Sequence, residues 1–166
     1  MVPVNRKEML LFMLDDAQSN LEMALKDLTS EEFYWKPVPG ALMPEQAFED
    51  PQPSGVSTIG FKIAHLVVGL ALTGEYAIGL GKLTPKDIFT RAPQDFAGWM
   101  EFLKEAIASF RQSFLDTSEE AMGEKTKAFW GAEYPAWQIW VWLIAHNTWH
   151  AAQVRTMRAL YQAKKP

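Results

Sequence analysis

The stretch from Pro135 to Gln162 reads PAWQIWVWLIAHNTWHAAQVRTMRALYQ and contains the longest helical repeat in this chain. Residues at alternating steps of three and four lie on one face of an α-helix. The segment therefore predicts a long helix beginning at Pro135, with His146 and His150 one turn apart on its inward face. The positions predicted to point inward are Leu143, His146, His150, Gln153, Met157 and Leu160.

Three earlier segments show the same repeat, namely residues 5–28, residues 57 to 79–81, and residues 93–116. Asn5 with Glu8, and Thr29 with Glu32, resemble helix caps in which side chains bond to the free amides of the first turn. Thr84-Pro85 predicts a further short helix. Because no strand-like alternation of useful length occurs, we expect an all-α four-helix bundle that forms a single domain over residues 1–166.

Two irregular connections are predicted between these helices. Residues 37–53 hold five of the ten prolines, so they form a long Pro-rich loop after the first helix. A loop of this length either lines a pocket or crosses the end of the bundle, and we favour the second. Residues 117–134 form the other connection. Three glycines within the second helix, Gly60, Gly69 and Gly74, indicate close helix approach or, less commonly, room for a ligand.

Composition excludes several classes of protein. The 166-residue chain is 48% hydrophobic with seven tryptophans, which excludes a disordered chain, and its net charge of −4 argues against a nucleic-acid partner. Its apolar runs are too short to cross a membrane, and its first residues do not resemble a secretory signal. It has no cysteine, which excludes disulfides, iron–sulfur clusters and a cysteine nucleophile. We expect a cytoplasmic location.

All three histidines fall on predicted apolar faces. A single buried histidine such as His65 is usually a neutral core residue bonded to a carbonyl oxygen or a side chain. That interpretation weakens for His146 and His150, because two adjacent buried imidazoles each need a partner. A divalent metal is a partner that all three can share. Three neutral ligands would leave coordination positions open for water or a substrate anion, as in catalytic metal sites.

Several rival sites lack their motifs in this sequence. His146 is followed by Asn147, so the zinc-protease motif His-Glu-x-x-His is absent, as are Glu-x-x-His and the glycine-rich phosphate loops. An iron site of two histidines and a carboxylate would leave one histidine over. Serine–histidine–aspartate chemistry stays open, although no nucleophile-elbow motif supports it.

The stretch His146-Asn-Thr-Trp-His150-Ala-Ala-Gln153, followed by Arg158-Ala-Leu, resembles the last helix of the DinB/YfiT-like superfamily. The segment from Ser57 to His65 is similar to the helix that carries the family's first metal histidine. The resemblance implies a four-helix bundle in which His65, His146 and His150 hold a divalent metal. Members often have Arg-Gly just before the glutamine, where this chain has Ala151-Ala152, so a function tied to that arginine is not implied.

The superfamily includes thiol-dependent transferases and isomerases, along with proposed metal-dependent hydrolases. The resemblance therefore implies zinc or nickel, with iron or manganese as alternatives, and a small-molecule substrate together with a low-molecular-weight thiol in the transferase case. Any thiol must come from outside the protein, because the chain has no cysteine. The opposing hypothesis is a non-catalytic helical bundle whose histidines are core residues or bind metal without turnover.

Other residues near the predicted metal site have less specific roles. Gln153, one turn beyond His150, either orients a ligand or bonds another helix, and Trp149 is the candidate pocket wall. Glu75 lies about 15 Å along the helix from His65, too far to bind the metal, so a solvated or capping carboxylate is the better interpretation. No general base is predicted. The aromatic-rich last helix predicts an apolar surface that a homodimer would bury.

Overall fold

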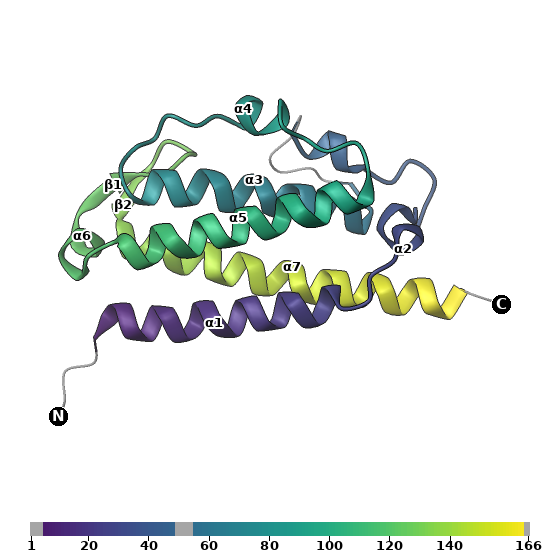
Figure 1. The fold of residues 1–166 in the computed structure, drawn as a ribbon, viewed down its shortest axis with the longest axis horizontal. Helices are drawn as coiled ribbons and strands as arrows, with labels where there is room; N and C mark the ends of the chain where they lie inside the picture. Colours follow the sequence, from purple (N-terminus) through teal and green to yellow (C-terminus); the bar gives the residue numbers. More distant parts are fainter. Residues whose placement is uncertain (1–4, 49–54, 165–166) are drawn as a thin grey trace.

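In the computed structural model, which describes residues 5–48 and 55–164, four long helices lie side by side (Figure 1). The long helices are α1 (Arg6–Leu25), α3 (Ile59–Ala77), α5 (Phe96–Asp116) and α7 (Ala136–Lys164). The short elements are α2 (Ser30–Tyr34), the 3-10 helix η1 (Pro44–Phe48), α4 (Pro85–Phe89), α6 (Glu119–Gly123), β1 (Lys125–Lys127) and β2 (Glu133–Pro135). The all-α four-helix bundle is confirmed.

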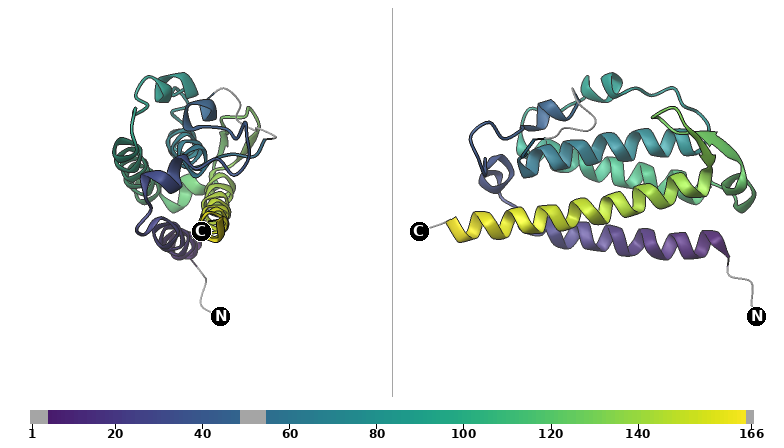
Figure 2. Two further views of the ribbon diagram at one scale, coloured as in Figure 1. Left: turned by 90° about the vertical axis from the view of Figure 1, so that its right-hand side faces the viewer. Right: turned by 180° about the vertical axis from the view of Figure 1, so that it is seen from behind.

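The bundle has two long helices in each direction. Figures 1 and 2 show α1 and α7 running one way and α3 and α5 running the other, so the chain crosses back over the bundle through α4 between α3 and α5. Helix α7 packs against α1 and α3, and α3 also packs against α5. The core between them is apolar, and Phe33, Phe110 and Trp140 are among its largest buried side chains, at most 2% exposed. None of the described helices is both long and apolar enough to cross a bilayer.

The predicted helix starts are present. The Asn5 side chain accepts from the amides of Lys7 and Glu8 at 2.9 and 3.3 Å, and Thr29 and Thr84 each form a capping box. The first helix is shorter than predicted, ending at Leu25 rather than Leu28, and Asp27 beyond it adopts a positive φ of 55°. The other long helices match their predicted bounds within a few residues.

The second irregular connection contains a hairpin that the sequence did not predict. Strands β1 and β2 pair antiparallel, and Thr126 Oγ1 donates to the Tyr76 carbonyl at 2.9 Å, which ties the hairpin to the end of α3. Gly131 lies at the hairpin loop with a φ of 94°, a conformation that favours glycine. Each strand has three residues, too few for a visible alternation.

Close approach explains one of the three glycines of α3. A Cβ on Gly60 would lie 2.5 Å from the Phe33 ring of α2, so α2 packs directly on the α3 backbone there. At Gly74, by contrast, a Cβ would lie 3.6 Å from Ser113 of α5, and at Gly69 it would lie 3.5 Å from His146 and Leu143 of α7, which are ordinary contact distances. The structure therefore supports close approach at Gly60 and does not distinguish the two explanations at Gly69 and Gly74.

The described part of the Pro-rich segment lies against α3. Leu42 pairs in parallel with Ser57 just before α3 begins, and η1 packs along α3. Residues 49–54 of this predicted loop lie outside the described residues. The segment therefore covers one side of α3 instead of only crossing the end of the bundle.

One predicted inward position on α7 is wrong. Leu160 is 51% exposed, because the last turns of α7 extend beyond the end of α1 (Figure 1) and little of the bundle remains to cover them. His65, predicted to be buried, is only partly so, whereas His146 and His150 are 8% and 4% exposed.

Candidate metal centre

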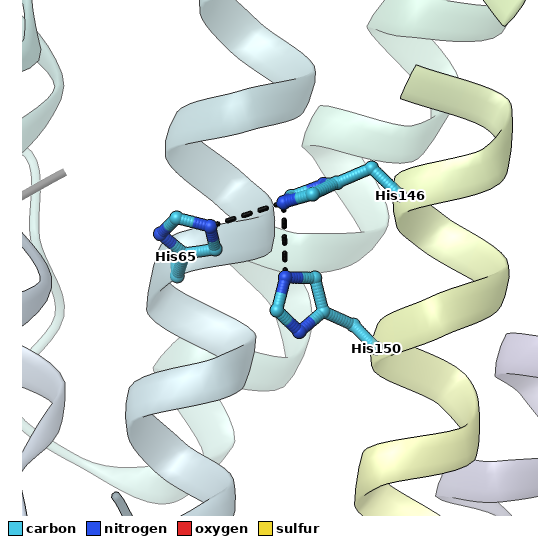
Figure 3. Close-up of side chains that lie close together, drawn as sticks. All are labelled: His65, His146 and His150. Carbon is cyan, nitrogen blue, oxygen red and sulfur yellow. Dashed lines mark hydrogen bonds between the residues drawn. The ribbon is translucent and has the colours of Figure 1, made fainter. Parts of the chain in front are cut away.

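The three histidines meet between α3 and α7. His65 projects from α3 and both other histidines project from α7, with their rings turned toward one another (Figure 3). The Nε2 atom of His146 lies 3.1 Å from that of His65 and 2.9 Å from that of His150. The structure thus brings together the three residues that the sequence proposed as a cluster.

This arrangement fits a divalent ion. Zinc–imidazole bonds of about 2.0–2.1 Å place neighbouring ligand nitrogens about 2.8–3.0 Å apart in octahedral geometry and about 3.3–3.4 Å apart in tetrahedral geometry. The observed Nε2–Nε2 distances of 2.9 and 3.1 Å lie within the span of these two geometries. Three nitrogen atoms that converge in this way also lack enough protons and lone pairs to satisfy one another by hydrogen bonds alone.

Gln153 orients one of the three rings. Its Oε1 atom lies 2.8 Å from Nδ1 of His150. Because an amide oxygen only accepts, His150 donates its Nδ1 proton there, which leaves the Nε2 lone pair free for a metal. The sequence left open whether Gln153 orients a ligand or bonds another helix, and its contact with His150 supports the first role.

His146 has no such partner within the described part of the chain. Its Nδ1 atom is buried and has no hydrogen-bond partner among the described residues. This side of the ring faces the backbone of α3 at Gly69, where a Cβ would lie 3.8 Å from Nδ1. Packing against α3 therefore positions this ring without a hydrogen bond at Nδ1.

The environment keeps the imidazoles neutral. Burial, followed by the positive charge of Lys62, lowers the pKa of His65 from 6.5 to about 4. Burial and then the neighbouring basic groups likewise lower the pKa of His146 to about 4 and that of His150 to about 3. At neutral pH all three rings are consequently in the form that binds a metal.

These pKa values predict an acid-sensitive metal-free protein. The pKa of each histidine is lower in the folded protein than the value of 6.5 in the unfolded chain. Between pH 6.5 and pH 4 the unfolded chain therefore binds more protons than the folded protein. The free energy of unfolding that the neutral imidazoles contribute above pH 6.5 is lost as the pH falls toward 4. Melting temperature in the presence of a chelator should fall across this window. A His146→Gln/His150→Gln variant should show a shallower dependence, and equal slopes would contradict the prediction.

An aromatic ring lies nearly parallel to each imidazole. The interplanar angles are 9° for Phe61 and His65, 16° for Trp142 and His146, and 18° for Trp149 and His150. Phe61 is buried, whereas Trp142 and Trp149 are 44% and 63% exposed. Trp149 thus lies beside the cluster but mostly in solvent.

Two residues near the cluster were missed from the sequence. Trp142 stands four residues before His146, and Lys62 stands three residues before His65, which are the spacings that place side chains on one helix face. The spacing is thus visible in the sequence. The tryptophans of the last helix, however, point in too many directions for spacing alone to show which of them lies beside a histidine. Glu75 accepts a hydrogen bond from the Leu83 amide, just before α4, so its carboxylate bonds to the backbone at the end of α3.

Comparison with known proteins agrees with this arrangement. The family model described as the DinB superfamily matches residues 13–154, which include all three histidines. No curated protein matches the chain. The chain belongs to the DinB superfamily.

Proposed function

We propose that this protein is a metal-dependent enzyme that acts on a small molecule at a centre formed by His65, His146 and His150. The observation that carries the proposal is the convergence of three neutral Nε2 atoms, with His146 Nε2 lying 2.9 and 3.1 Å from the other two. Zinc or nickel is the proposed metal, with iron or manganese as alternatives.

The chain's own residues have distinct tasks in this proposal. The three imidazoles hold the ion, Gln153 fixes the tautomer of His150, and Phe61, Trp142 and Trp149 cover the imidazole faces and limit access of water. The ion, when bound, lowers the pKa of a coordinated water or thiol and so generates a nucleophile at neutral pH. With water the protein would be a hydrolase, and with an external thiol a transferase.

Cobalt(II) provides a test that also separates the two reactions. Metal-free protein is loaded with cobalt(II), and its visible spectrum is recorded before and after addition of a small thiol. A spectrum that changes with added ligand supports exchangeable positions, and a sulfur-to-cobalt charge-transfer band favours the transferase. Failure to bind any of cobalt, zinc and nickel would refute the proposal of a metal-dependent enzyme, and the histidines would then be core residues.

Replacing Gln153 by leucine is expected to weaken metal binding by about 10-fold to 100-fold, because loss of the acceptor at Nδ1 frees His150 to adopt the wrong tautomer. Competition with a chromophoric zinc chelator measures the change. Gln153→Glu keeps an acceptor at this position and should retain tight binding. Equal affinity of Gln153→Leu and the unchanged protein would remove the proposed role.

We also propose that the protein is a homodimer, with the contact on α1. Trp137 and Trp140 of the aromatic-rich α7 pack into or against the core, so less of that helix is free for a partner than the sequence suggested. On α1, by contrast, Met9, Phe12 and Met13 are 50%, 74% and 37% exposed. Light scattering at micromolar concentration should give twice the chain mass, and Phe12→Glu should give the mass of one chain.

A further inference from the structure

Lys62 is a cation without a counter-ion beside the histidine cluster. It lies one turn before His65 on α3, is partly buried, and forms no hydrogen bond or ion pair within the described part of the chain. Its recorded contact is with the Phe61 ring, whose centroid lies 5.7 Å from Nζ. A half-buried ammonium group that lacks an acidic partner is unusual, because burial removes part of its hydration.

The charge of Lys62 reaches all three histidines. It contributes to lowering the pKa of His65, His146 and His150, and no described carboxylate contributes to those three values. A divalent ion at this place would add two further positive charges. The whole site therefore favours an anion over a neutral molecule.

Trp149 supplies a flat apolar surface at the same end of the cluster. Figure 1 shows that α3 and α7 run in opposite directions, so Lys62, one turn before His65, lies toward the end at which His150 and Trp149 are found. The indole of Trp149 stacks on His150 at a centroid distance of 5.8 Å and is 63% exposed. An exposed indole at such a position suits a flat apolar group.

We propose that the ligand of the metal centre is a small organic anion with a flat apolar body, whose acidic group is bound with the help of Lys62 and whose body lies against Trp149. The inference rests on the proposed metal-dependent function and adds the chemical class of its substrate. In this proposal Lys62 recognises the charge of the ligand and Trp149 recognises its apolar body. Replacing Lys62 should therefore weaken binding of anions, whereas replacing Trp149 should weaken binding of ligands with a flat apolar body.

Calorimetry on the zinc-loaded protein tests this assignment. The probes are 1-naphthoate, its neutral carboxamide, and acetate measured by competition against 1-naphthoate. We expect 1-naphthoate to bind at least about tenfold more tightly than the carboxamide, and Lys62→Met to remove that difference. Lys62→Arg keeps the charge and should retain it. Trp149→Ala should weaken 1-naphthoate by about fivefold to tenfold and leave acetate unchanged.

Two exposed positions away from the cluster serve as matched controls. Lys104→Met on α5 and Leu80→Ala after the end of α3 should leave all three affinities unchanged. Zinc content of every variant is measured first. If the unchanged protein binds none of zinc, nickel or cobalt, the proposed function fails and this inference fails with it. If zinc is bound but the carboxamide binds as tightly as 1-naphthoate, or Lys62→Met has no effect, this inference alone is overturned.

Discussion

The double variant His146→Ala/His150→Ala is expected to lose metal binding altogether. Its one remaining imidazole, His65, would hold an ion only weakly, because two of the three converging Nε2 atoms are gone. Elemental mass spectrometry of untagged protein should find about one zinc, nickel, iron or manganese ion per chain in the unchanged protein and none in the variant. Zinc should raise the melting temperature of the unchanged protein alone.

The variant's fold must be checked separately, because both histidines are buried. Circular dichroism should show an unchanged helical content, since alanine favours helices and the two positions lie within α7. His146→Gln/His150→Gln, which keeps side-chain volume better, provides a second variant. An unchanged metal content in either folded variant would show that the ion binds elsewhere.

Replacing Arg158 by methionine is expected to lower the free energy of unfolding by about 3–5 kcal/mol, because it leaves a buried carboxylate without its cation. Glu32, on α2, is 2% exposed, and Arg158 Nε donates to its Oε1 atom at 3.1 Å. The same guanidinium donates to the carbonyls of Ala24 and Lys26 at 2.9 and 2.7 Å. Urea unfolding measures the loss.

Arg155→Met is the matched control, three residues earlier on the same helix. Arg155 bonds to Asn20 at the surface, so its removal should change stability by less than about 1 kcal/mol. If Arg158→Met also lowered the free energy of unfolding by less than about 1 kcal/mol, the prediction for Arg158 would be contradicted.

The Arg158 contact also has a pH dependence. Burial raises the pKa of Glu32, but hydrogen bonds from Thr29, Arg158 and Gln162 outweigh it and hold the pKa below 4.5. The stabilisation is thus present above pH 4.5 and is lost as the pH falls through the folded value.

The helices could be predicted from the sequence because their signals are local. The four long repeats, and the caps at Asn5, Thr29 and Thr84, depend on side chains within a few residues of one another. The hairpin of β1 and β2 could not be predicted in this way. One of the contacts that hold it is the hydrogen bond from Thr126 to the Tyr76 carbonyl, fifty positions earlier in the chain. The exposure of Leu160 likewise depends on where α1 ends.

The cluster of histidines was predictable, while its surroundings were not. An i, i+4 pair on one face and a third histidine on another helix are visible in the sequence, and bundle packing brings them together. The absence of a partner for His146 Nδ1 depends on how closely Gly69 of α3 approaches that ring, which only the packed structure reveals. The stacking of Trp142 on His146 also depends on side-chain conformations that spacing does not determine.

The three clustered histidines come from two helices, and His65 and His146 are 81 positions apart in the chain. An ion bound there would close a long loop of the chain, as a disulfide does in other small proteins. A cross-link over a loop of this length removes conformational freedom from the unfolded chain worth about 4–5 kcal/mol. In a chain without cysteine, the metal would thus serve as a reversible cross-link. A chelator would remove this cross-link, as a reductant removes a disulfide.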